Sequence, residues 1–180
     1  MGYSPVRTGL AMLPLVAMNV TAATRLSGRL LPRLQPQLLI VPGLLCAAGS
    51  LPLLTQLTPH SSYTAIVLPA ELLLGVGIGT LFGPAVATAT DGVAPHDAGI
   101  ASATVNTAQQ TGASIGTALL NTVAAGATST YLADHHGADV LRDATVHGYA
   151  TAATWALGIM LGTAALAALF ITADPRKTAP

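Results

Sequence analysis

The fold of this chain is decided by residues 65–89, AIVLPAELLLGVGIGTLFGPAVATA, where Glu71 is the single charged side chain. The part from Leu72 to Thr90 carries no charge. Its length is close to the roughly 20 residues that cross the hydrocarbon core of a bilayer as a helix. We therefore predict a transmembrane helix over residues 63–90.

The composition of the chain extends this prediction beyond that one helix. Charged residues make up 8% of its 180 residues and hydrophobic residues 52%, whereas a soluble domain has about 25% charged residues. A water-soluble surface cannot be built from so few charges. The seven basic and seven acidic residues cancel, so the net charge indicates neither a nucleic-acid partner nor an acidic substrate. The predicted fold class is an all-α integral membrane protein, with the lipid bilayer as its partner.

The charged residues fall in short islands that leave about five uncharged stretches long enough to span a bilayer. Several stretches contain proline, which neighbouring helices accommodate in a membrane, so we expect kinks there and not breaks. Residues 1–7 do not begin a signal-peptide pattern, so we expect the first helix to be retained. We predict one membrane region over residues 1–180, with helices over 8–26, 37–57, 63–90, 99–127 and 148–172, an outer loop over 129–147 and a short cytoplasmic tail over 173–180.

Basic residues in the connectors predict the orientation. Arg25, Arg29 and Arg33 follow the first predicted helix, and Arg176 and Lys177 follow the fifth. With five helices these two regions lie on the same side, which an excess of basic residues identifies as the cytoplasm. We therefore expect a multi-pass protein of the cell membrane with a cytoplasmic C-terminus.

Glu71 is the one acidic residue within a predicted span. An ionisable group at membrane depth is costly and is a candidate functional group. Gly75, Gly79 and Gly83 follow at four-residue steps, so Glu71 lies near a smooth helix-packing face that a second helix can approach. Loss of hydration there suits a carboxyl group that binds and releases protons during transport. The alternative is that Glu71 reaches the outer interface or makes a structural pair.

The fourth predicted helix carries polar residues at three- or four-residue steps, which form one stripe. A polar stripe within hydrocarbon must face protein or water. It either makes hydrogen bonds between helices or lines a substrate pathway. On a neighbouring face, Gly112 and Gly116 form a pair of small residues suited to helix packing. The stripe consists of Ser102, Asn106, Gln110, Ser114, Thr117 and Asn121.

The remaining chemistry-bearing residues give weak patterns. His135 and His136 with Asp139 and Asp143 faintly resemble a metal site, but a solvated outer loop explains them better. The run GVGIG at 75–79 lacks the preceding strand of a dinucleotide-binding loop. We find no motif for nucleophilic catalysis and no phosphate-binding loop, so we expect no enzyme activity, no metal and no cofactor.

Three motifs carry a resemblance that covers nearly the whole chain. Residues 4–14, SPVRTGLAMLP, look like S-P-x-x-x-G-L-x-x-L-P, and residues 28–33, GRLLPR, look like G-R-L-x-D-R. Residues 99–112, GIASATVNTAQQTG, are similar to G-x-A-S-x-x-x-N-x-x-R-Q-x-G. Together they resemble the last five helices of the fourteen-helix drug:proton antiporter branch of the major facilitator superfamily.

Two residues depart from the family pattern. Pro32 stands where the cytoplasmic loop usually has an acid, between Gly28, Arg29 and Arg33. Gln109 replaces the usual arginine, which keeps a hydrogen-bonding group and removes a fixed cation. Any role that the acid and the arginine have in relatives must be filled differently here.

The resemblance implies proton-driven export of amphipathic or lipophilic compounds by alternating access between two helical halves. Five helices are too few for both halves, so we expect a fragment, either truncated or part of a split transporter, that is inactive alone. Its partners would be the missing N-terminal helices and a small-molecule substrate. The alternative is a small membrane scaffold or regulatory subunit without transport activity. An intramembrane enzyme using Glu71 is disfavoured, because no second acid, histidine pair or metal set lies inside a span.

Overall fold

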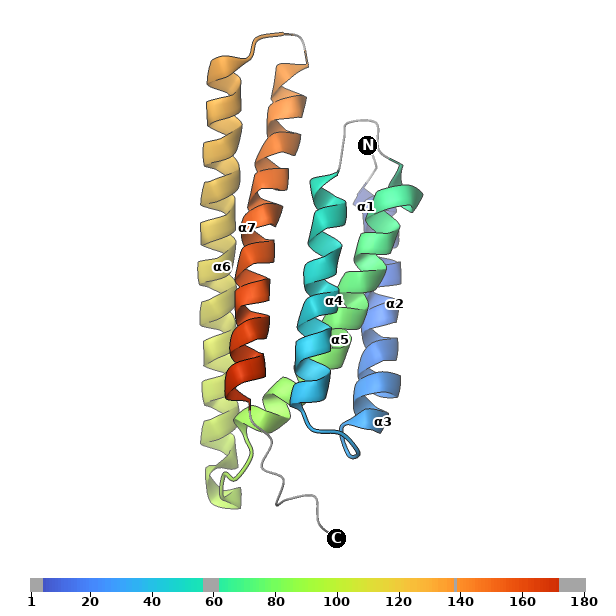
Figure 1. The fold of residues 1–180 in the computed structure, drawn as a ribbon, viewed down its shortest axis with the longest axis vertical. Helices are drawn as coiled ribbons and strands as arrows, with labels where there is room; N and C mark the ends of the chain where they lie inside the picture. The colour runs from blue at the N-terminus through green and yellow to red at the C-terminus, as the bar shows by residue number, and fades with distance from the viewer. Residues whose placement is uncertain (1–4, 57–61, 138, 172–180) are drawn as a thin grey trace.

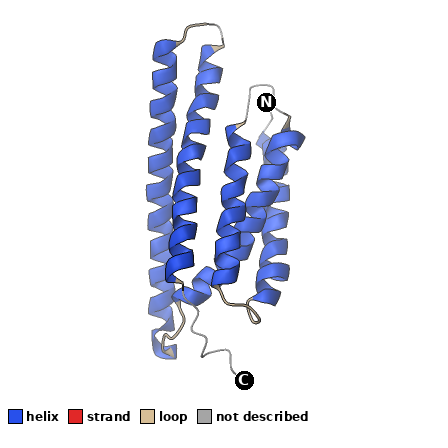
Figure 2. Cartoon of the chain, viewed as in Figure 1, coloured by secondary structure: helices blue, strands red, loops and turns tan. Residues whose placement is uncertain are grey.

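The computed structural model describes residues 5–56, 62–137 and 139–171. All regular structure in these ranges is helical (Figure 2). Four helical spans are long and apolar enough to cross a membrane. The predicted class, an all-α membrane protein, is therefore confirmed. The four spans are Pro5–Leu30, Gln37–Thr55, Tyr63–Ala89 and Val140–Phe170.

The first span is built from consecutive helical pieces and is not one regular helix. It bends at Met12, because Pro14 has no N–H to donate and its ring crowds the preceding turn. Further along, the chain passes through a π-helical turn before its last short helix. The pieces are α1 (Pro5–Ala11), α2 (Leu13–Thr21), the π-helical turn η1 (Ala22–Ser27) and α3 (Gly28–Leu30).

The second and third spans form the centre of the molecule. The second is α4 (Gln37–Thr55), and the third is α5 (Leu68–Ala89) preceded by the π-helical turn η2 (Tyr63–Val67). Both α4 and α5 contain internal proline but continue through it, as is common where neighbouring helices enclose the backbone.

The last two helices are longer than the rest. After the short 3₁₀ helix η3 (Pro95–Asp97), α6 runs from Ala98 to Asp134, and α7 from Val140 to Phe170. At 1.5 Å per residue, α6 is about 55 Å long and α7 about 46 Å, whereas a hydrocarbon core is about 30 Å thick. In Figure 1 their paired ends extend well past the other helices.

The structure is helical up to Asp134 and again from Val140, so the break between α6 and α7 is shorter than the predicted outer loop over 129–147, whose place outside the membrane stays a prediction. Charged and polar residues mark where a chain leaves the bilayer, but a helix continues until its backbone hydrogen bonding ends. Here α6 ends at Asp134 and α7 begins at Val140, and Gly137 between them adopts a φ of 157°. The predicted tail over 173–180, with Arg176 and Lys177, lies outside the described residues.

The helices stand side by side in a row (Figure 1). On one side α5 packs against α2 and η1, and on the other against α4. Next, α4 packs against α7, and α7 against α6, which stands at the edge. One hydrogen bond links the start of α4 to the last turn of α7: Gln37 Nε2 donates to the Ala168 carbonyl at 2.7 Å. The Ala168 carbonyl is one of the last four carbonyl groups of α7, and these groups have no hydrogen-bond partner within a regular helix.

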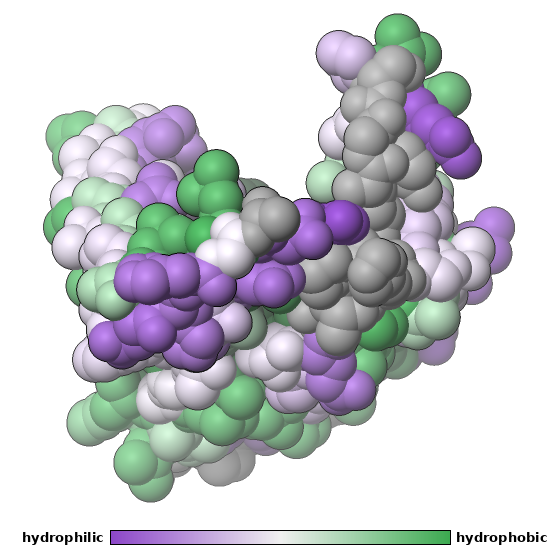
Figure 3. Space-filling view, turned by 90° about the horizontal axis from the view of Figure 1, so that it is seen from above, coloured by the Kyte–Doolittle hydropathy of each residue, from purple (hydrophilic) through white to green (hydrophobic). Residues whose placement is uncertain are grey.

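Alanine makes up most of the buried hydrophobic residues in the described part of the chain, with Leu39 and Ile40 as the large ones, while many other large apolar side chains are exposed. Leu169 is 73% exposed and Phe170 76%. Such a distribution is unfavourable in water and normal where lipid surrounds the helices. Seen from above, hydrophilic residues gather over the end of the bundle and apolar ones are frequent along its margin (Figure 3). The buried alanines are Ala22, Ala47, Ala48, Ala70, Ala144, Ala152 and Ala164.

Candidate functional site

Glu71 lies in the first turn of α5 and is buried, with 6% of its surface exposed. The Tyr63 hydroxyl lies 3.0 Å from its Oε2, within hydrogen-bonding distance. Oε1 is buried and has no hydrogen-bond partner. Buried carboxyl oxygens are normally hydrogen-bonded, so Glu71 is a place of incomplete hydrogen bonding in the interior.

Tyr63 connects Glu71 to the first span, because its hydroxyl also lies 2.5 Å from the carbonyl oxygen of Ala11, at the break between α1 and α2. In a regular α-helix, residues eight apart are rotated by about 80°. A π-helical turn takes up one extra residue, which reduces the rotation to about 20°. Pro69 favours this turn because it has no N–H, and the Leu68 N–H donates to the Tyr63 carbonyl.

The glycines of α5 lie on two packing faces. A Cβ atom added to Gly75 would come within 2.6 Å of the Leu15 carbonyl oxygen, and one added to Gly79 would overlap the Asn19 carbonyl. These two glycines therefore allow the first span to approach α5 closely. Gly83, further along this face, has the Ser27 hydroxyl 3.2 Å from its Cβ position.

The opposite face of α5 contacts α4 through a glycine that the sequence analysis did not single out. A Cβ atom on Gly77 would lie 2.6 Å from the Ala47 nitrogen and 2.7 Å from the Gly43 carbonyl oxygen. Its signal in the sequence was the GVGIG run itself. Alternate glycines on a helix lie about 200° apart and so face opposite neighbours.

All six residues of the predicted polar stripe lie on α6 and are exposed. The helix packs mainly against α7 and has no buried residue along its whole length. Within the stripe, the Ser114 hydroxyl donates to the Gln110 carbonyl at 2.8 Å, a bond inside the same helix. The polar side chains of the stripe lower the hydropathy of α6, which is not among the four apolar spans. No other described residue buries the stripe.

Gly112 and Gly116 also lie on α6, and a Cβ atom on either would meet no atom within 4 Å. The close contact between α6 and α7 is made elsewhere, at Gly148, which the sequence analysis missed. A Cβ atom there would lie 2.6 Å from the Ala124 carbonyl oxygen and would overlap the Thr128 hydroxyl.

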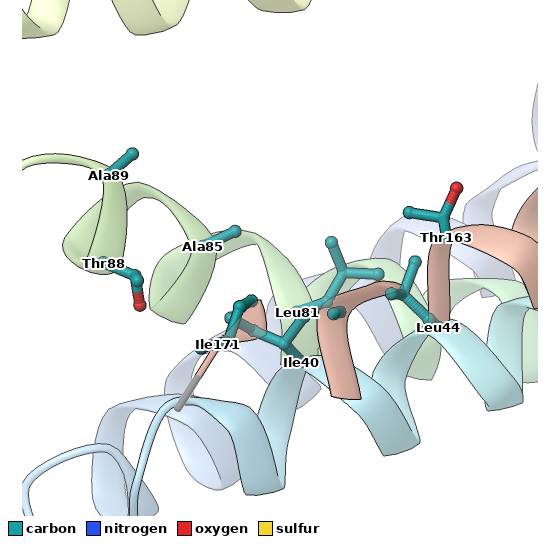
Figure 4. A pocket seen from close by; sticks show the side chains of 9 residues that line it. Ile40, Leu44, Leu81, Ala85, Thr88, Ala89, Thr163 and Ile171 are labelled. Atoms are coloured by element: carbon teal, nitrogen blue, oxygen red, sulfur yellow. The ribbon is translucent and has the colours of Figure 1, made fainter. Parts of the chain in front are cut away.

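An apolar groove of about 380 Å³ opens between α4, α5 and α7 (Figure 4). Its lining includes Ile40 and Leu44 of α4, Leu81 of α5 and Thr163 of α7. The groove is at the opposite end of α5 from Glu71, and no ionisable group lines it.

The remaining predicted residues lie at the two ends of the bundle. Gly28, Arg29 and Arg33 are exposed around α3 and the turn after it. At the other end, His135 stacks on Tyr131, with ring centroids 4.0 Å apart. In the described part of the chain, no group of three histidine, cysteine or acidic residues is arranged to hold a metal ion.

Comparison with known proteins identifies the family of this chain. The model of the Major Facilitator Superfamily matches residues 1–117. The chain belongs to this superfamily. The chain is 50% identical over 172 residues to a puromycin resistance protein of Streptomyces alboniger, an alignment that covers 94% of the chain and 34% of that protein.

Two further relatives of this major facilitator chain are also described by resistance or export. It is 36% identical over 142 residues to a cephamycin export protein of Amycolatopsis lactamdurans, covering 76% of the chain and 29% of the relative. It is 28% identical over 119 residues to a multidrug resistance protein B homolog of Mycobacterium tuberculosis, covering 66% and 22%. The chain thus spans about a third or less of the length of these relatives.

Proposed function

We propose that this chain forms the C-terminal part of a proton-coupled exporter of small amphipathic or lipophilic compounds. The observation that carries the proposal is its 50% identity to a puromycin resistance protein over nearly its whole length. Because that alignment covers 34% of the relative, we propose that further helices complete the transporter and that the chain alone does not transport.

The exposed stripe on α6 supports this proposal. Polar side chains within a bilayer face protein or water and not lipid. We assign the stripe to the side of α6 that meets the completing helices or a water-filled substrate pathway. By helix geometry Asn106 and Ile115 lie about 180° apart on α6, and Ile115 is 65% exposed. In our proposal Ile115 faces lipid.

Labelling of single cysteines tests the assignment of the stripe. In a Cys46→Ala background, the assembled transporter carries either Asn106→Cys or the matched control Ile115→Cys. A water-soluble maleimide is expected to modify the first and not the second, and added substrate is expected to slow the first reaction. Equal labelling at both positions would contradict the assignment.

Efflux measurements test the transport function itself. Cells expressing the chain together with the preceding helices of a relative are expected to export ethidium and puromycin. Cells expressing these 180 residues alone are expected to retain both compounds. Export by the chain alone would refute its role as a part, whereas no export by either would favour a scaffold or regulatory subunit.

Glu71 is our candidate for the proton-coupling residue, since it is buried in a span with an unpaired oxygen. We assign the end of the bundle that carries the 135–139 connector to the outside and the end that carries Arg29 and Arg33 to the cytoplasm of the cell membrane. Proton entry would then reach Glu71 from the outer side.

A further inference from the structure

The Tyr63 hydroxyl stands between two acceptors, the Ala11 carbonyl oxygen at 2.5 Å and the Glu71 Oε2 at 3.0 Å. A phenol carries one proton, and a backbone carbonyl can only accept. The contact with Ala11 is the shorter of the two. If the Tyr63 hydroxyl donates its one proton to the Ala11 carbonyl, it has none left for Glu71. A hydrogen bond between Tyr63 and Glu71 then forms only when the Glu71 carboxyl group is protonated and acts as the donor.

We propose that Tyr63 is a positioning residue that senses whether Glu71 carries a proton and accordingly holds or releases the first span. With a proton on Oε2, Glu71 donates to the phenol and the phenol donates to Ala11, so a continuous chain of bonds joins α5 to the break between α1 and α2. When the proton leaves to water, the carboxylate accepts the phenol proton and Ala11 loses its partner. The inference rests on the proposed function for the exchange of a proton at Glu71.

The backbone on both sides of this contact is suited to movement. The first span is interrupted at Met12 next to Pro14, and Tyr63 begins a π-helical turn that ends just before Pro69. Each proline removes one backbone donor, so fewer hydrogen bonds resist bending at these two points than in a regular helix. One side-chain bond more or less can therefore change the angle at which the spans meet.

Few other ionisable groups pack against this end of α5. Along its described length α2 has none, and α4 has Cys46. Arg7 of α1 is exposed one turn before Ala11, and Arg25 of η1 lies towards the opposite end of the first span. The Tyr63 hydroxyl lies 3.0 Å from Oε2 of Glu71.

Dipolar electron paramagnetic resonance tests the proposal on the 180-residue chain in lipid nanodiscs. Spin labels are placed at Val6→Cys and Ala65→Cys, two exposed positions on α1 and η2, in a Cys46→Ala background. The distance between labels is expected to be short and narrowly distributed at low pH, and longer and broader at high pH. Tyr63→Phe is expected to give the broad distribution at both pH values. Glu71→Gln, whose amide still donates to the phenol, is expected to give the narrow one at both.

Infrared difference spectra separate this inference from the proposed function. The carboxylic C=O stretch that disappears in Glu71→Gln reports the proton on Glu71. If that band does not change with pH, proton exchange at Glu71 fails, and the inference fails with it. If the band titrates but the label distance stays constant, or Tyr63→Phe responds like the parent chain, the role of Tyr63 is overturned and the proton site stands.

Two controls keep the test decisive. His60 lies three residues before Tyr63 in the sequence, and histidine is the side chain type that most often changes charge between pH 5 and 8. The His60→Ala chain must keep the distance change, and loss of the change would overturn the proposal. Circular dichroism checks that each variant keeps its helical content. Should Tyr63→Phe lose it, the C–O stretch of Tyr63 in the parent chain gives the same test, because it must shift as the Glu71 band disappears.

Discussion

Replacing Gly77 with alanine is expected to separate α4 from α5. The added Cβ atom would lie 2.6 Å from the Ala47 nitrogen, 2.7 Å from the Ala47 Cβ and 2.7 Å from the Gly43 carbonyl oxygen. Carbon atoms in good contact are about 3.5 to 4.0 Å apart, so the helices must move by about 1 Å. Since the obstacles are mostly backbone atoms, no side-chain rotation relieves the overlap.

The size of the effect follows from two opposing terms. Overpacking of a tight interface costs about 1 to 3 kcal/mol, and the fixed backbone atoms put Gly77→Ala at about 3 kcal/mol. Alanine favours the helix over glycine by about 1 kcal/mol. The net loss in the free energy of unfolding is therefore about 2 kcal/mol, or roughly a 30-fold change in the ratio of folded to unfolded chain.

Reversible unfolding in mixed micelles, followed by circular dichroism and by the fluorescence of Trp155, measures this loss. Gly112→Ala is the matched control, because its Cβ atom would meet nothing within 4 Å. This control is expected to unfold no more easily than the parent chain. A Gly77→Ala chain as stable as the parent, or equal losses in both variants, would refute the packing argument.

Three further substitutions test other parts of the structure. Gly148→Ala is expected to destabilise the α6–α7 hairpin by about 1 to 2 kcal/mol. The control Gly158→Ala is expected to leave the hairpin unchanged, because its Cβ atom would meet nothing within 4 Å. Proteolysis of the hairpin compares the two variants, and similar cleavage of both would contradict the prediction. Gln37→Leu removes the bond to Ala168 and is expected to destabilise the bundle by about 0.6 to 2 kcal/mol in the same unfolding assay, and an unchanged midpoint would count against it. In the assembled transporter, Glu71→Gln is expected to abolish pH-driven export of ethidium while membrane insertion stays normal. Unchanged pH-driven export would return Glu71 to a structural role.

The fold class was predictable from the sequence because membrane spans depend on a local property. The free energy of transferring each stretch into lipid follows from its own residues, and the absence of charge after Glu71 was sufficient for α5. Helix ends were harder to predict. At 129–147 the polar residues predicted a loop, but the helices continue into this stretch from both sides, because backbone hydrogen bonding does not require lipid.

The arrangement around Glu71 was not predictable from residue spacing. Tyr63 is eight residues from Glu71, a separation that leaves the two side chains about 80° apart on a regular α-helix, and the π-helical turn before Pro69 brings them closer to one line. Likewise, which neighbour occupies each glycine face of α5 depends on contacts between distant parts of the chain. Gly77 and Gly148 could be assigned only once those neighbours were known. The functional roles of Glu71 and the stripe stay predictions.

The position of α6 at the edge of the row has a consequence for biogenesis. It is the least apolar of the long helices and packs mainly against α7, yet it leaves the ribosome before α7. A newly made α6 therefore enters the translocon before its main described neighbour exists. We expect it to be retained there until α7 arrives, so that the two partition into lipid together. A nonsense mutation between them would leave an orphaned α6, a substrate for membrane quality-control proteases.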